Sequence, residues 1–184
     1  MIPDTDQVRN LWEKYRLPDM KRRHVTLVNS AVMLLSELIY KNTGEGGNDA
    51  LLSAAALLHD IDKAVPGLPG EAHPDTGVRI LNEEGMPEVA ELVRRHPLHA
   101  ILDPAIRPRT RDERLLFLAD KMVKHDFISV DKRFALWRAE PLDTKSRAVL
   151  RKTYPLVKEL EREVFRSAGV TQPKFAKMAR LRYT

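Results

Sequence analysis

At residues 54–63 the chain reads AAALLHDIDK, an apolar run that ends abruptly in a histidine, two carboxylates and a lysine. Alanine and leucine are strong helix formers, and Asn48 or Asp49 just upstream can cap a helix that carries this run. The stretch therefore predicts a buried helix whose end brings polar side chains to the edge of a core. Because a His-Asp pair arises readily by chance, partners elsewhere in the chain must decide what it does.

Helical periodicity recurs on both sides of this stretch. Apolar residues share one face of a first helix that ends at Pro18, and they cover a broad face of a second helix at about residues 23–40. Downstream, Thr110 and Glu113 form a capping box before the apolar run 115–119, which predicts another buried helix. No stretch alternates strongly enough to predict a strand. The expected fold is an all-α, single-domain helical bundle of roughly six to nine helices.

Proline and glycine divide the remaining segments. They predict a turn-rich connection at residues 66–70 and an irregular segment at residues 96–110. Pro155 is expected to kink or split a long helix at about residues 144–166. The basic residues 171–184 are only weakly periodic, so they form a tail that either packs or frays.

The composition is that of an ordinary globular protein of one domain. Of the 184 residues 43% are hydrophobic and 31% are charged. No apolar stretch approaches the roughly 20 residues that cross a membrane, and the N-terminus lacks a signal pattern, so we expect no membrane association and a cytoplasmic location. Because the chain has no cysteine, disulfides, thiolate metal sites and cysteine nucleophiles are excluded, which leaves imidazole and carboxylate as metal ligands.

The charge of the chain favours anionic partners. The net charge is +5, and basic side chains concentrate at Arg107, Arg109, Arg111 and Arg114. These four arginines are either an exposed loop and helix face or a grip for a phosphate. Aromatic residues make up only 6% of the chain and do not alternate with the arginines, so a stacking platform for single strands is not predicted. A nucleotide is therefore favoured over a nucleic acid.

Residues that bind metals stand at the ends of three apolar helices. Asp60 and Asp120 each close a strongly apolar run, His59 precedes Asp60, and His24 stands at the start of the second helix. A buried carboxylate is unfavourable unless it is paired, hydrogen-bonded or bound to a metal. Neutral imidazole and carboxylate together suit iron, manganese, zinc and related divalent ions, and two ions can share one carboxylate. These residues are therefore candidate metal ligands.

The order of these residues resembles that of a known family. His24, then the sequence HDIDK at residues 59–63, and finally Asp120 are similar to the pattern of the HD-domain superfamily of metal-dependent phosphohydrolases. Further segments that resemble members of this family lie at residues 73–81, 93–96, 118–121 and 131–134. The resemblance implies an HD-type helical bundle at about residues 20–135, followed by a C-terminal helical extension with a basic tail at about 141–184.

The resemblance also implies a dinuclear centre of two divalent ions, with Fe, Mn, Zn, Ni, Co and Mg as candidates. The first ion would bind His24, His59, Asp60 and Asp120, and the second would bind Asp60, His73 and His96. Asp60 and Lys63 would be the catalytic residues, with Lys63 facing the substrate phosphate and a metal-activated water as the nucleophile. The subgroup that this chain resembles includes hydrolases of dinucleoside tetraphosphates, so the implied substrate is a nucleotide or another small phosphorylated molecule.

Several functional assignments stay open. His99, Arg107 and Arg109 join Lys63 as expected substrate contacts, although His99 could instead support or replace a metal ligand. Asp62 stands where many relatives have glycine or alanine, so it either tunes substrate choice or is solvated. The segment after His96 also lacks the Thr-x-Gly pattern that we associate with tetraphosphate hydrolases. The alternative function is a non-catalytic HD-like module that senses a nucleotide or binds a partner.

Structural roles compete with these functional ones. His73 and His96 each precede a proline and could serve as helix caps, and Lys63 could be a cation that the helix dipole favours. The second His-Asp pair, residues 125–126, has no later acidic partner in an apolar helix. We expect this pair to be a solvated helix end.

Overall fold

A computed structural model describes residues 1–183 and is predominantly helical. These residues contain nine α-helices, one short 3-10 helix and no strand, apart from an isolated bridge between Val123 and Phe127. The all-α, single-domain prediction is confirmed. The helices are α1 Thr5–Lys14, α2 Asp19–Thr43, α3 Asp49–Leu58, α4 Asp75–Glu83, α5 Pro87–Arg94, η1 Leu98–Leu102, α6 Arg111–Lys121, α7 Val130–Arg138, α8 Thr144–Ala168 and α9 Gln172–Tyr183.

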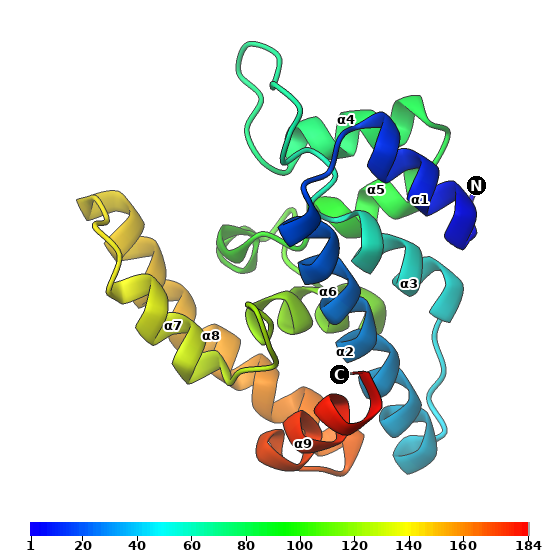
Figure 1. Ribbon diagram of the computed structural model, residues 1–184. Helices are drawn as coiled ribbons and strands as arrows, with labels where there is room; N and C mark the ends of the chain where they lie inside the picture. The colour runs from blue at the N-terminus through cyan, green and yellow to red at the C-terminus, as the bar shows by residue number, and fades with distance from the viewer. Residues whose placement is uncertain (184) are drawn as a thin grey trace.

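Helix α2 lies at the centre of the bundle, where it contacts α3, α6, α8 and α9 (Figure 1). Its broad apolar face is fully buried at Val28, Val32 and Leu35. The helix extends beyond the predicted residues 23–40 at both ends, because Pro18 and Gly44 rather than apolar spacing set its limits. It starts directly after Pro18 and ends at Gly44, whose φ of 75° is the left-handed conformation that closes a helix without a steric penalty.

The sequence left alternatives open for two C-terminal segments. Helix α8 runs unbroken through Pro155, so the predicted split does not occur. Residues 172–183 form α9, which packs rather than frays because Phe175 and Ala179 are fully buried and Phe175 meets Phe165 edge-on. Thr184, the last residue of the predicted tail, lies outside the described residues.

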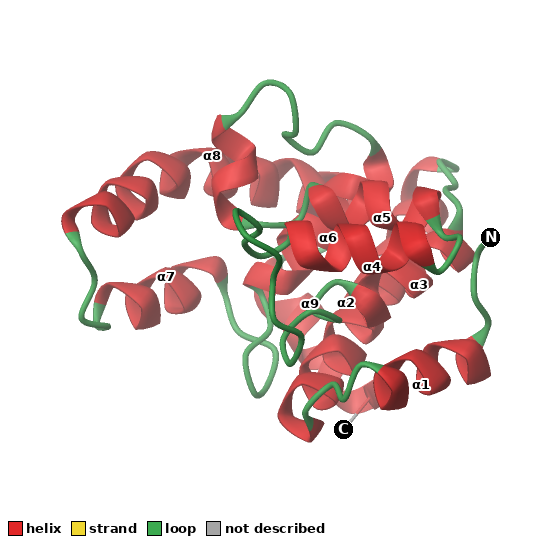
Figure 2. Ribbon diagram, turned by 90° about the horizontal axis from the view of Figure 1, so that it is seen from above, coloured by secondary structure: helices red, strands yellow, loops and turns green. Residues whose placement is uncertain are grey.

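One continuous hydrophobic core includes residues from all nine α-helices of the described chain. Helix α7 packs on α8, and both extend to one side of the main body (Figure 2). The predicted HD core ends at about residue 135, inside α7, and the predicted C-terminal extension begins at about residue 141, in the loop before α8; that division stays a prediction. Within residues 1–183, no helix is both long enough and apolar enough to span a bilayer.

The polar centre of the molecule lies where several helix ends meet. His24 belongs to the second turn of α2, and His59 caps the end of α3. His73 precedes α4, His96 follows α5, and Asp120 is the penultimate residue of α6. Because α3 contacts α2, α5 and α6, these ends are held close to one another.

Candidate metal centre

The end of α3 turns two neighbouring polar side chains into the protein. The helix stops at Leu58, His59 caps it, and Asp60 follows in a turn. In a continuous helix, adjacent side chains would point about 100° apart. His59 and Asp60 are both buried, at 1% and 4% exposure, where the α-helix gives way to a turn. The helix end therefore allows both residues to face one site.

A first group of ligands forms around His59. The Nε2 atom of His24 lies 3.0 Å from Oδ1 of Asp120. The Nε2 atom of His59 lies 3.6 Å from the same Asp120 oxygen and 4.0 Å from Oδ2 of Asp60. Side chains from α2, the end of α3 and α6 therefore meet at one point.

Asp60 also faces a second group of ligands. Its Oδ1 atom lies 3.8 Å from Nε2 of His73, and that nitrogen lies 3.1 Å from Nε2 of His96. The structure thus brings together all six residues identified from the sequence as metal ligands. Their ligand atoms form three overlapping triads, with all atoms of a triad within 4.8 Å of one another: His24–His59–Asp60, His59–His96–Asp120 and Asp60–His73–His96.

Backbone hydrogen bonds orient two of the histidine rings. Nδ1 of His59 donates to the Ala56 carbonyl at 2.8 Å, and Nδ1 of His96 donates to the Val93 carbonyl at 2.6 Å. A neutral ring that donates through Nδ1 keeps the lone pair of Nε2 for a metal. Nε2 of His59 is buried and has no hydrogen-bond partner among residues 1–183. A cation between His59 and the carboxylates would satisfy this atom, so the donor set fits a divalent metal ion.

Asp62 holds the ring of His73 from behind. Its carboxylate is buried, and Oδ1 and Oδ2 lie 3.0 and 2.9 Å from Nδ1 of His73. A carboxylate in this position fixes the orientation of a histidine ligand and makes its other nitrogen more basic. The expectation that Asp62 is solvated is therefore wrong, because the turn after α3 directs the side chain inward. Its effect on substrate choice stays a prediction.

The charges around the site keep both carboxylates ionised. Burial raises the pKa of Asp60, but the charges of His59 and Lys63 outweigh it and hold that pKa well below its usual range. Burial also raises the pKa of Asp120, yet the charge of Lys121 and the nearby His24 and His59 rings hold that pKa far below the usual value. Both side chains can therefore act as anionic ligands at neutral pH.

The pKa values of the two buried histidines, His59 and His96, shift in opposite directions. Burial lowers the pKa of His59, but the charges of Asp60 and Asp120 outweigh burial and raise it. Burial, with the positive charges of His59 and Lys121, lowers the pKa of His96 well below its usual value. His96 is therefore neutral, whereas a proton on His59 would compete with a metal ion for Nε2.

Two lysines support the carboxylates, and sequence reasoning did not identify either. Nζ of Lys21 lies 2.9 Å from Oδ2 of Asp60. Lys21 precedes His24 by three residues and so shares its helix face, which was the available signal. Lys121 is fully buried: its Nζ lies 2.9 Å from Oδ2 of Asp120, donates to the His96 carbonyl and stands 4.2 Å from the centre of the Phe117 ring. Burial lowers the pKa of Lys121, which Asp120 partly restores.

The ligands open onto a cleft of ≈ 300 Å³. Lys63, with Nζ 3.4 Å from Oδ1 of Asp60, lines this cleft, as does the exposed His99. Partial burial and the charge of Lys121 lower the pKa of His99. Arg133 from α7 also lines the cleft, and its Nε is buried with no hydrogen-bond partner in the described chain. Arg133 lies in the segment 131–134 that resembles the HD family, but the sequence assigned it no role, because its position at the cleft depends on how α7 packs.

The remaining predicted residues lie elsewhere. Arg107 and Arg109 line a different cleft with residues of α8, so the structure does not bring them to the histidines, and their substrate role stays a prediction. The second His-Asp pair belongs to a turn after α6, where His125 is exposed and Asp126 pairs with Arg180 at 2.8 Å.

Comparisons with known proteins give one match. A family model described as HD domain matches residues 30–124, slightly more than half of the chain. This span includes His59, Asp60, His73, His96 and Asp120, whereas His24 lies just before it. Comparisons with curated proteins and with solved structures found no match.

Proposed function

Because the chain belongs to the HD-domain family, we propose that it is a metal-dependent phosphohydrolase. Its substrate would be a nucleotide or another small phosphorylated molecule, in which it hydrolyses a phosphoester or phosphoanhydride bond. One observation carries the proposal: six ligand-type side chains converge from helix ends across the bundle, and the buried Nε2 of His59 among them has no hydrogen-bond partner in the described chain.

The overlapping triads suit two ions. His24, His59 and Asp120 would hold one ion, and His73 and His96 would hold the other. Asp60 would serve both, because its Oδ2 faces His59 and its Oδ1 faces His73. Bound divalent ions would lower the pKa of a water molecule, neutralise phosphate charge and align the attacking and leaving oxygens. Iron, manganese, zinc, nickel, cobalt and magnesium are the candidates for this nitrogen and oxygen donor set.

The cations of the cleft would orient the phosphate. Lys21 and Lys63 flank Asp60 from two sides, and Arg133 lines the same cleft. Arg133 lines the cleft and forms no ion pair in the described chain, so its charge is available to an anionic ligand. These side chains would position a phosphate oxygen beside Asp60 and stabilise the negative charge of the transition state.

Metal analysis of the native protein, followed by phosphate-release assays with nucleotides and other phosphate esters, tests this proposal. Asp60→Ala should lose metal and turnover, because Asp60 is shared by both ion positions, while circular dichroism should show most of the helix content retained. The matched control is Asp126→Ala, which removes a carboxylate from the second His-Asp pair at the surface and should preserve metal content and turnover.

Three results would change the conclusion. A protein that holds no metal, and that releases no phosphate or nucleotide with any added divalent ion, would overturn the proposal. Unchanged turnover in Asp60→Ala would refute the site. Calorimetric binding of a nucleotide without hydrolysis over hours would favour the alternative, a non-catalytic nucleotide sensor or partner-binding module.

A further inference from the structure

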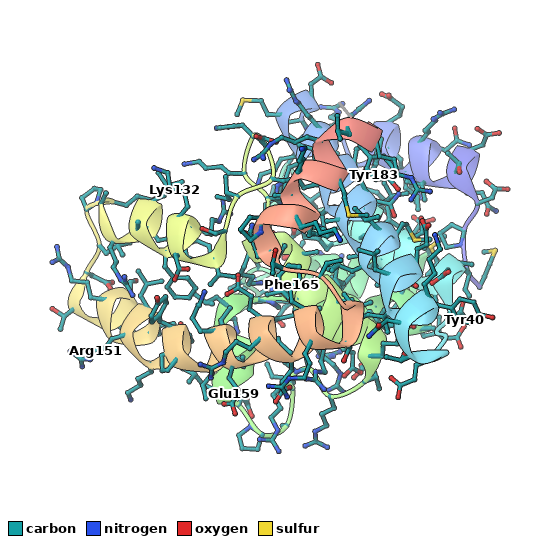
Figure 3. All side chains as sticks on the ribbon, turned by 90° about the horizontal axis from the view of Figure 1, so that it is seen from below. Tyr40, Lys132, Arg151, Glu159, Phe165 and Tyr183 are labelled. Carbon is teal, nitrogen blue, oxygen red and sulfur yellow. The ribbon has the colours of Figure 1, made fainter. Side chains whose placement is uncertain are left out.

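A second cavity lies next to the metal cleft, between η1, α7 and the first turns of α8. This open cavity has a volume of ≈ 710 Å³, which is within the range of about 300–1,000 Å³ typical of small-molecule sites. Leu98, His99 and Trp137 line both this cavity and the metal cleft. The two spaces are therefore neighbours that share one wall. The helix pair α7 and α8 that frames the cavity is seen in Figure 3, where Lys132 labels α7 and Arg151 labels α8.

The walls of this cavity are mostly apolar. Leu142 from the loop before α8, with Val149 and Leu150 from α8, lies across from Leu98 and Trp137 of the shared wall. Ser146 and the exposed Lys145 are the polar side chains that α8 contributes. An apolar space with a few polar groups suits an organic ring or chain better than a hydrated phosphate.

Trp137 links the apolar cavity to the phosphate cleft. The Arg133 guanidinium lies 4.7 Å from the centre of the Trp137 ring, and the Phe134 ring meets it edge-on at 5.2 Å. These contacts hold the indole in place. Because Arg133 also lines the metal cleft, a phosphate held there would lie beside the aromatic wall of the apolar cavity.

We propose that this cavity binds the organic group of the substrate, a flat aromatic group attached to the phosphate that the metal cleft holds. The substrate class is then a phosphate ester or anhydride of an aromatic-bearing group, such as a nucleoside, and excludes inorganic polyphosphates and simple sugar phosphates. The inference rests on the proposed function for the phosphate position and adds the group that determines specificity. Stacking on an aromatic side chain favours a base by about 1–3 kcal/mol, which corresponds to roughly five- to 150-fold in affinity.

Trp137 provides a direct readout of binding, because the chain has only two tryptophans. The other is Trp12 in α1, whose Nε1 donates to the Leu57 carbonyl at 2.9 Å. In a Trp12→Phe background loaded with zinc, adenosine monophosphate should change Trp137 emission and bind about tenfold or more tightly than ribose 5-phosphate or inorganic phosphate. Equal affinities, or no change in emission at saturating adenosine monophosphate, would overturn the inference.

A pair of variants tests the cavity itself. Val149→Phe fills it from α8 and should weaken adenosine monophosphate binding by a similar factor, with zinc content and circular dichroism unchanged. Leu181→Phe places the same ring on the exposed face of α9 and should leave affinity unchanged. If Val149→Phe loses its fold, Ser146→Phe at the half-buried first turn of α8 replaces it. Unaltered affinity in the folded variant would refute the cavity as the site.

The two proposals can fail separately. If adenosine monophosphate changes the emission but no substrate is turned over, the cavity is supported as a binding site and the phosphohydrolase activity is refuted. If ribose 5-phosphate and adenosine monophosphate are turned over equally, the phosphohydrolase activity is supported and the specificity for an aromatic group is refuted.

Discussion

Removal of the Asp62 carboxylate should weaken one ion site and spare the other. Asp62 contacts His73, a candidate ligand of the second ion, through Nδ1 at 3.0 and 2.9 Å. It forms no hydrogen bond or ion pair with His24, His59 or Asp120, the ligands specific to the first ion, in the described chain. Asp62→Ala would free the His73 ring to rotate, and Asp62→Asn would keep an acceptor oxygen but lose the negative charge.

Two estimates of the metal affinity lost in Asp62→Ala agree. Mutation of a carboxylate behind a histidine ligand lowers metal affinity by about 10- to 100-fold. That factor equals about 1.4–2.7 kcal/mol, close to the roughly 1.5–3 kcal/mol of a hydrogen bond to a charged group. We expect Asp62→Ala to lose this much metal-binding free energy at the second ion site and Asp62→Asn to lose less.

Competition titration of zinc against a chelating dye measures the two dissociation constants. Asp75→Ala serves as the control, because it removes an exposed carboxylate two residues from His73 that forms no hydrogen bond or ion pair in the described chain. An equal loss of affinity at both sites, or no loss at either, would refute the reasoning. A similar loss in Asp75→Ala would show that general charge, rather than the contact with His73, matters.

Three further predictions concern stability. Leu58 is fully buried directly before His59, so Leu58→Ala should lower the free energy of unfolding, measured with urea, by about 2–5 kcal/mol. Leu181→Ala, at a side chain that is 80% exposed, should change this free energy by less than about 0.5 kcal/mol. Chelation should lower Tm by roughly 5–10 °C, because an ion at about 100 times its Kd stabilises the native state by about 2.7 kcal/mol; Asp60→Ala should show no such shift. Pro155→Ala should stabilise the protein by about 1–3 kcal/mol, since a proline inside a continuous helix lacks a backbone donor, and a lower urea midpoint would contradict this.

Features that depend on nearby residues were predictable. The capping box of Thr110 and Glu113 forms as expected and starts α6, because both partners lie within one turn. The apolar run before His59 forms a buried helix for the same reason. The unbroken course of α8 through Pro155 was not predictable, because its tertiary contacts outweigh the local cost of proline. The packing of α9 likewise depends on Phe165, an aromatic partner in another helix.

The amino-acid order alone predicted the chemistry of the candidate centre: imidazole and carboxylate side chains at the ends of apolar helices, in the order that resembles the HD family. It could not identify the contacts between those ends. His24 and Asp120 are 96 positions apart and Lys21 and Asp60 are 39 apart, so their contacts exist only after α2, α3 and α6 have packed. The same packing placed Asp62 behind His73, brought Arg133 and Trp137 to the cleft, and left Arg107 and Arg109 in another one. Short-range patterns specify which groups reach a helix end, whereas burial of apolar faces between distant helices determines which groups meet.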